Sequence, residues 1–133
     1  VCDDFVYLQD LYPTFLEIAG RPLPQEPDTL SILDQVKGRP ASTGRDSVYA
    51  QFFGQLFRYE QRMVRTRTHK LTYNHSDIAE LYDLVNDPWE MHNLIDLPGV
   101  KGMQDELLQR IRETMVTLGD PALRDFDTIR AVL

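Results

Sequence analysis

The sequence has only one cysteine, Cys2, in 133 residues. A single thiol excludes an internal disulfide and any cluster of thiolate metal ligands, and it leaves the redox compartment undecided. No apolar run approaches the roughly 18 residues that a membrane-spanning helix needs, so we expect no membrane partner. Positive charge is scarce as well. The net charge of -7 argues against a nucleic-acid partner, because phosphate binding requires clustered Lys and Arg.

Metal-ligand patterns are also lacking. The three histidines show no i, i+4 spacing, so no histidine metal site is predicted. A group of four carboxylates could supply the oxygens that calcium prefers. They are Glu80, Asp83, Asp87 and Glu90. Because Asp87 precedes Pro88 and Glu90 would begin a helical turn, we interpret the group as a turn and a helix cap. We therefore predict no metal site in this chain.

What is present is the composition of an ordinary globular protein, with 42% apolar and 26% charged residues. Near the start, Asp10 is predicted to cap a helix over residues 11–19. The predicted buried stripe of this helix consists of Leu11, Phe15, Ile18 and Ala19. Residues 20–44 are then rich in Pro, Gly, Ser and Thr, which predicts a surface wrap with one or two helical turns at most.

From Ser47 the pattern changes to short segments rich in aromatic and β-branched residues. Strands are predicted over residues 48–53, 62–68, 70–74 and 79–84. Short connections between them imply antiparallel neighbours. Residues 103–118 repeat apolar side chains at helical spacing, whereas residues 122–133 show no clear period. The predicted fold class is therefore α+β, a small antiparallel sheet of about four strands with a C-terminal amphipathic helix packed on it.

The predicted connection over residues 54–61 carries aromatic side chains, which is unusual for a solvated loop. Arg62 follows it directly, and a guanidinium fork suits sulfate, phosphate or carboxylate oxygens. The alternative is that Arg62 presents its charge to water or to nearby acidic side chains. The residues themselves leave both interpretations open.

Three segments together resemble the C-terminal part of the sulfatases, hydrolases of the alkaline-phosphatase-like superfamily. They are Val6 to Gly20 with Asp10-Leu11-Tyr12-Pro13-Thr14, Arg62 to Thr66 with Lys70-Leu71, and Glu80 to Leu84 with Asp87-Pro88, Glu90 and Asn93-Leu94. The last segment is the most specific. It predicts a short strand that stops at an Asp-Pro turn, followed by one helical turn, with the Asn93 amide tying the chain back.

The resemblance implies that this chain is the C-terminal portion of a sulfatase and inactive alone. Residues 1–44 would be the end of the parent's main α/β domain, with a strand, a helix and a surface wrap. Residues 45–133 would form the C-terminal subdomain. The implied partners are the N-terminal catalytic domain of the parent and a sulfate ester of a sugar or an aryl group. That the first residue is Val and not Met leads us to expect a piece of a longer chain.

The resemblance also implies which groups this chain lacks. The family's nucleophile motif, Cys or Ser followed by x-Pro-x-Arg, is absent, because Cys2 precedes Asp3 and Asp4. Calcium and formylglycine are expected in the parent enzyme, upstream of residue 1, and this chain is expected to supply no catalytic residue and to bind no cofactor.

For the substrate, the resemblance implies aromatic faces for a ring and amide or guanidinium groups for its polar substituents. The predicted substrate contacts are Gln51, Phe53, Tyr59, Gln61 and Arg62. Two alternatives stay open. The parent could be a phosphodiesterase or phosphonate monoester hydrolase of the same superfamily, or the chain could be a stand-alone interaction module.

Overall fold

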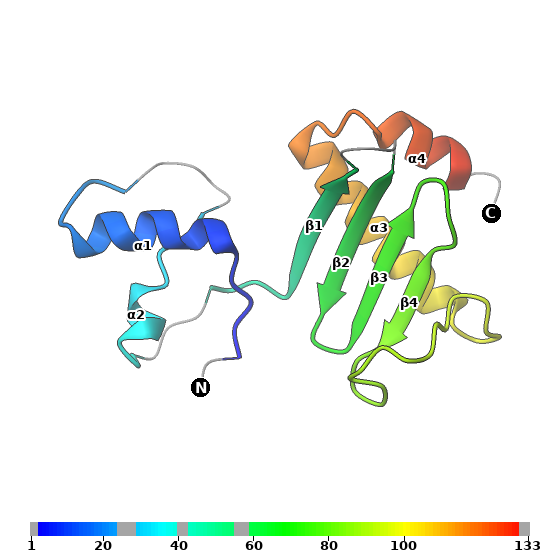
Figure 1. The fold of residues 1–133 in the computed structure, drawn as a ribbon, viewed down its shortest axis with the longest axis horizontal. Helices are drawn as coiled ribbons and strands as arrows, with labels where there is room; N and C mark the ends of the chain where they lie inside the picture. The colour runs from blue at the N-terminus through cyan, green and yellow to red at the C-terminus, as the bar shows by residue number, and fades with distance from the viewer. Residues whose placement is uncertain (1–2, 24–28, 40–42, 55–58, 131–133) are drawn as a thin grey trace. The chain divides into compact units, whose positions relative to one another are not determined.

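The computed structural model describes residues 3–23, 29–39, 43–54 and 59–130. The chain forms two compact units, Val1–Val48 and Tyr49–Leu133. Figure 1 shows short helices in the first unit and a sheet with two helices in the second. None of the described helices is both long and apolar enough to cross a membrane.

In the first unit, a 3-10 turn, η1 (Leu8–Asp10), leads directly into α1 (Leu11–Ile18). The prediction that Asp10 caps α1 is wrong, because the helical path already begins at Leu8 and places Asp10 inside it. Its carboxylate instead reaches back to the N–H of Tyr7, at 2.8 Å. The same carboxylate accepts the N–H of Leu30 at 3.0 Å and both ends of the Arg45 guanidinium, at 2.6 and 2.9 Å.

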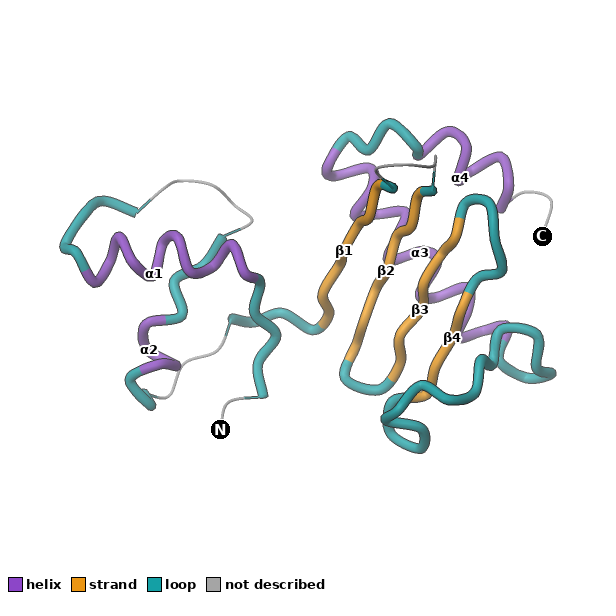
Figure 2. The backbone as a smooth tube through the Cα atoms, viewed as in Figure 1, coloured by secondary structure: helices purple, strands orange, loops and turns teal. Residues whose placement is uncertain are grey.

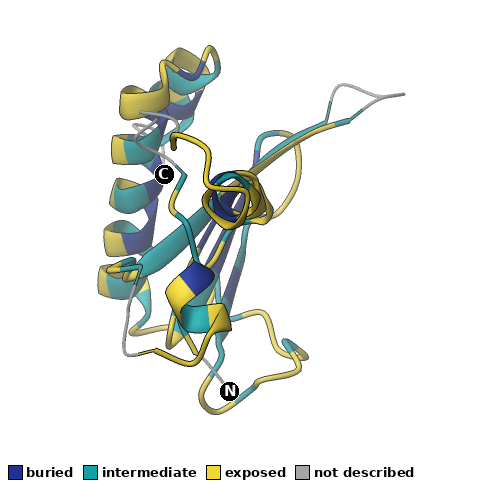
Figure 3. Cartoon of the chain, turned by 90° about the vertical axis from the view of Figure 1, so that its left-hand side faces the viewer, coloured by how far each residue is buried: buried dark blue, intermediate teal, exposed yellow. Residues whose placement is uncertain are grey.

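The predicted buried stripe of α1 is also wrong within this chain. Phe15 and Ile18 are 62% and 61% exposed, and Figure 3 shows α1 mostly in the colour of exposed residues. The helix packs through its other side, where Thr14 is buried and its hydroxyl accepts the N–H of Ile32 at 3.0 Å. This contact holds the segment that leads into α2 (Leu33–Val36). The apolar stripe therefore faces outward from the unit.

The second unit contains the predicted sheet. Its strands are β1 (Ser47–Phe53), β2 (Glu60–Thr66), β3 (His69–Asn74) and β4 (Glu80–Asp83). They lie side by side in chain order, as Figure 2 shows, and adjacent strands run antiparallel. Val64 pairs with Leu71, and Leu71 pairs with Leu81, so one apolar row crosses three strands. The prediction of the α+β class with a four-stranded antiparallel sheet is confirmed.

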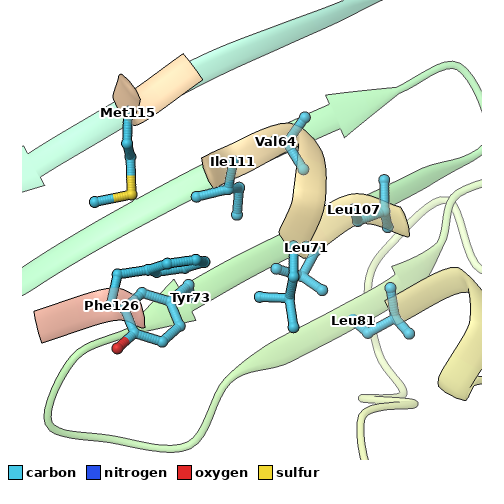
Figure 4. Packing of buried hydrophobic residues seen from close by; sticks show 9 residues of the cluster. Val64, Leu71, Tyr73, Leu81, Leu107, Ile111, Met115 and Phe126 are labelled. Atoms are coloured by element: carbon cyan, nitrogen blue, oxygen red, sulfur yellow. The ribbon is translucent and has the colours of Figure 1, made fainter. Parts of the chain in front are cut away.

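One face of the sheet is covered by α3 (Lys101–Leu118), as predicted from its apolar period. Figure 3 shows α3 turning its buried side toward the strands. Gly119, at φ 62°, ends the helix in the left-handed conformation that glycine adopts without strain. Figure 4 shows how the side chains of helix and strands interlock. The core consists of Val64, Leu71, Tyr73, Leu81, Leu107, Leu108, Ile111, Met115 and Phe126.

A further helix, α4 (Leu123–Arg130), was not predicted. It contributes Phe126, which is 1% exposed and lies edge-on to the ring of Tyr73, with ring centroids 4.7 Å apart. Phe126 is the buried residue of this helix, with Leu123 packed against the core beside it. A short helix with one buried residue leaves no period in the sequence.

The segment after β4 confirms one prediction and corrects another. The side chain of Asn93 ties the chain back to β4, as predicted: its amide donates to the carbonyl of Ala79 and its oxygen accepts the N–H of Leu81. The predicted helical turn after Pro88 is wrong, because the chain forms successive turns there. Glu90 has φ 56°, a left-handed conformation that interrupts any right-handed helix.

Candidate functional site

The five predicted substrate contacts lie at one end of the β1–β2 pair. Gln51 and Phe53 are exposed side chains on β1, and Gln61 and Arg62 belong to β2. Tyr59 stands just before β2, where its carbonyl accepts the N–H of Gly54 at 2.7 Å. This backbone bond closes the two strand ends on each other. Residues 55–58 of the predicted loop lie outside the described residues.

The structure divides these five residues between the two faces of the sheet. Successive side chains of a strand point to opposite faces, so Gln61 and Arg62 diverge. Arg62 lies on the face that α3 covers, with its guanidinium carbon 4.7 Å from the ring centroid of Phe53. Gln61 lies on the other face, paired with Asn74. Phe53 and Arg62 thus form one group, with Gln51 on the same face two residues before Phe53, and Tyr59 and Gln61 form another.

On the covered face, Arg62 is only 1% exposed and makes a two-point ion pair with Asp120. Its Nε lies 2.6 Å from one carboxylate oxygen, and its Nη2 lies 2.9 Å from the other. Its remaining terminal nitrogen donates to the carbonyl of Gln61 at 3.0 Å. The hydrogen bonds that Arg62 donates to Asp120 raise the pKa of Arg62 further, so the guanidinium stays charged. Its charge is engaged by an acidic side chain of the protein, which agrees with the second of the two open interpretations, although the partner is distant in the sequence and buried.

Asp120 is the partner that sequence reasoning missed. It follows Gly119 at the end of α3, so in the sequence it belongs to a helix stop and nothing more. Its hydrogen bonds from Arg62 lower the pKa of its carboxyl, although burial opposes this shift. One carboxylate oxygen also accepts the N–H of Ala122, at 2.9 Å, which fixes the turn into α4. Because 58 residues separate Arg62 and Asp120, no local pattern announces the pair.

Tyr49 of β1, which is half-buried, completes this group. Its hydroxyl donates to Asp120 over 3.4 Å, and burial raises the pKa of Tyr49 to about 12. The phenol therefore stays neutral over the whole physiological range. Tyr49, Arg62 and Asp120 together join β1, β2 and the end of α3.

On the other face, the amide of Gln61 connects two neighbours. It donates to the hydroxyl of Tyr59 at 3.1 Å and to the side-chain oxygen of Asn74 at 2.6 Å. Asn74 in turn donates to the carbonyl of Ile78 at 2.6 Å, across the turn that follows β3. A ring and an amide held in this way can offer a flat surface and polar groups to a ligand.

The acidic group near β4 is engaged by its own neighbours. One oxygen of Asp83 accepts the N–H of Val85, and one oxygen of Asp87 accepts the N–H of His92. Glu90 forms an ion pair with Lys70. Across the described residues, no group of three or more His, Cys, Asp or Glu side chains could hold a metal ion.

Comparisons with known proteins agree on one group of enzymes. Residues 1–117 match the family described as N-sulphoglucosamine sulphohydrolase, C-terminal. An uncharacterized protein of Haemophilus influenzae is 36% identical over 90% of this chain and 61% of its own length. An ulvan-active sulfatase of Formosa agariphila is 26% identical, over 89% of this chain and 30% of its own length. The chain thus spans less than two thirds of the curated relatives it matches.

Solved structures show the same likeness. One of them is the structure of a protein in complex with its substrate, D-glucosamine-2-N,6-O-disulfate. It matches this chain with a TM-score of 0.70 and 27% identity, over 84% of this chain and 24% of the other chain. A phosphonate monoester hydrolase from Silicibacter pomeroyi has a TM-score of 0.67 at 17% identity, over 81% of this chain and 24% of the other, a likeness of fold alone.

Proposed function

From the premise that the chain belongs to the family of N-sulphoglucosamine sulphohydrolase C-terminal domains, we propose that it is the C-terminal lobe of a sulfatase that hydrolyses the sulfate groups of a saccharide. The parent enzyme would supply the nucleophile and the metal ligands from its own N-terminal catalytic domain. This lobe would brace that domain and line part of the substrate pocket, and it would be inactive alone.

One observation carries the proposal: the family match covers residues 1–117, while the relatives named as sulfatases are covered over only 30% and 20% of their lengths. A chain of that extent corresponds to one part of such an enzyme. The saccharide is proposed because the related ulvan-active and N-acetylglucosamine-6-O-sulfatases are named for sugar substrates.

The bracing role is supported by the outward apolar stripe of the first unit. Leu8, Phe15 and Ile18 are 85%, 62% and 61% exposed, and they recur at helical spacing along η1 and α1. Such an uncovered row is costly in water and favours burial against another surface. We assign that surface to the catalytic domain of the parent.

The cofactors of the parent are expected to lie outside this chain. Calcium would neutralise the charge of the sulfate, and formylglycine would supply the nucleophile. Asp83 and Asp87 accept N–H groups of their own turns and Glu90 pairs with Lys70, which supports placing the calcium ligands in the catalytic domain. This chain would therefore contribute to binding and support.

The test is to express the full-length parent and measure sulfate release from N-sulfated and 6-O-sulfated glucosamine and from an aryl sulfate. We expect turnover by the parent and none by residues 1–133 alone. Turnover that scales with the amount of the purified 133-residue chain would overturn the division of roles.

The alternative ester is tested in the same experiment. Turnover of a phenylphosphonate monoester or a phosphodiester, with sulfate esters left intact, would identify a phosphonate monoester hydrolase or phosphodiesterase instead. A parent that hydrolyses neither class would favour the interaction module. The phosphonate enzymes share only the fold, so sulfate esters are the first choice.

A further inference from the structure

We propose that Asp120 is a positioning residue of the substrate pocket, acting through Arg62 on the paired ends of β1 and β2. This inference rests on the proposed function, because it concerns residues that would line the pocket. Of the predicted substrate contacts, Arg62 is the one that Asp120 binds in the described structure. Its effect on a ligand would come from holding Phe53 and Gln61 in place.

The first step is the geometry of one guanidinium. Arg62 directs Nε and Nη2 to the two oxygens of Asp120, while Nη1 donates to the carbonyl of Gln61 at 3.0 Å. The flat face of the same group lies against the ring of Phe53, at 4.7 Å. A planar group with both oxygens of one carboxylate as anchors cannot rotate without breaking a bond. Its orientation therefore fixes two neighbours on different strands.

The second step is that Asp120 is itself held. It accepts the N–H of Ala122 at 2.9 Å and the hydroxyl of Tyr49 at 3.4 Å. Its own carbonyl accepts the N–H of Leu123 at 3.1 Å, within the turn from α3 into α4. The end of α3 is therefore a fixed support for the guanidinium.

The third step concerns the ends of β1 and β2, which the ion pair holds in place. Phe53 is 47% exposed, so part of its ring stays open while Arg62 contacts the ring. Next to it, Gly54 and Tyr59 close the strand ends through the 2.7 Å backbone bond. Gln61 joins this end from the other face, through its bond to the Tyr59 hydroxyl. The ion pair thus lies directly behind the edge that would meet a ligand.

The chain offers a control pair with the same fork geometry at a partly exposed position. Arg112 makes a similar two-point ion pair with Asp127, at 2.7 and 3.0 Å, which joins α3 to α4 and includes no residue of β1 or β2. Arg62→Lys and Arg112→Lys therefore remove the same fork from two pairs, and only the first one supports the strand ends. A lysine keeps the charge but cannot bind both Asp120 oxygens and the Gln61 carbonyl in one plane.

The experiment compares both variants in the full-length parent. With a sulfated disaccharide as substrate, we expect Arg62→Lys to raise KM by about threefold or more, with a smaller change in kcat for the same substrate. Amide hydrogen exchange should become faster in peptides that cover residues 49–54 and 59–62. Arg112→Lys should leave both measurements at the wild-type values. An unchanged KM and unchanged exchange in Arg62→Lys, or equal effects in the control, would overturn the inference.

A second variant covers the case in which Arg62→Lys does not fold. The double substitution Arg62→Met with Asp120→Asn removes both buried charges together, so neither position is left with an unpaired ion. Faster exchange at the strand ends with a raised KM would support the inference, and wild-type values would overturn it. If the wild-type parent releases no sulfate, the proposed function fails, and the exchange comparison alone decides on the role of Asp120.

Discussion

Asn93 makes the hydrogen bond to the backbone of Leu81 that a further strand beside β4 would make. Its side-chain oxygen accepts the N–H of Leu81 at 3.0 Å, and the adjacent residue, Leu94, donates its own N–H to the carbonyl of Leu81 at 2.8 Å. Leu81 is fully buried in the core. The outer edge of β4 is thus satisfied at its most buried position by an amide and a loop.

This relationship predicts the effect of Asn93→Ala. The substitution leaves the N–H of Leu81 without its acceptor, and we expect a loss of about 1–3 kcal/mol in the free energy of unfolding. Urea denaturation followed by circular dichroism measures it. Asn86→Ala is the control, because Asn86 contacts Asp83 in an exposed turn. Equal losses in both variants would contradict the role given to Asn93.

The attachment of α4 to the core can be tested at Phe126. Phe126→Ala removes the side chain that packs against Tyr73 and leaves a cavity, so we expect a loss of about 3–5 kcal/mol. Val116→Ala, on α3 at a side chain that is 50% exposed, should change the stability far less. A small loss in Phe126→Ala would mean that α4 is not fixed by this residue.

The depressed pKa of Asp120 predicts how stability depends on acid. Because Arg62 holds this pKa below its usual range, the ion pair adds stability above the unfolded value of about 3.9. That contribution is lost as the pH falls through the folded pKa. We expect the free energy of unfolding to fall steeply below about pH 4. Two other groups face the pair. Glu60 lies 3.7 Å from the Arg62 guanidinium, and the Tyr49 hydroxyl stays neutral throughout this pH range because its pKa is raised to about 12.

Asp120→Asn gives the matching measurement. The variant should be less stable at neutral pH, because the buried guanidinium loses its counter-ion, and its stability should change less between about pH 4 and pH 2. Urea denaturation across this range, compared with the wild type, measures both slopes. Parallel curves for the two proteins would show that Asp120 does not titrate with a depressed pKa.

The outward apolar stripe of α1 predicts that one substitution changes the free energy of unfolding differently in the 133-residue chain and in the full-length parent. In the 133-residue chain, Phe15→Ser should leave the free energy of unfolding nearly unchanged, because the ring is already 62% exposed. In the full-length parent, the same change should cost about 1.5–3 kcal/mol, the value of burying one large apolar side chain. Thermal unfolding of both proteins measures the difference. Equal effects in the two contexts would remove this stripe from the bracing surface.

The sheet could be predicted because its signals are local. Alternation and turn residues mark the strands, and the period around Ile111 marks α3. The direction of the α1 stripe could not be read in the same way, since an apolar face shows that a surface will be buried without showing what buries it. The helical period therefore places Phe15 in a core that the described part of the chain does not form around it, since the residue is 62% exposed there.

The site shows a similar limit. The sequence placed Phe53, Tyr59 and Arg62 at one end of the β1–β2 pair, and the structure has them there. Their division between two faces follows from strand alternation at Gln61 and Arg62. Asp120 could not be found, because its role depends on a contact with Arg62 far along the chain. Whether these residues bind a substrate stays a prediction.

The chain-order arrangement of the strands also bears on how the second unit folds. Each strand pairs with its sequence neighbour, so most of the sheet can form through short loop closures, which favours rapid folding. The hydrogen bonds that Arg62 and Tyr49 donate to Asp120 span 58 and 71 residues and need α3 to be in place. They would therefore form late, after the hairpins and the helix have met. The side chains of Arg62 and Tyr49, behind the strand ends nearest the predicted pocket, would then be the last of this group to reach their final positions.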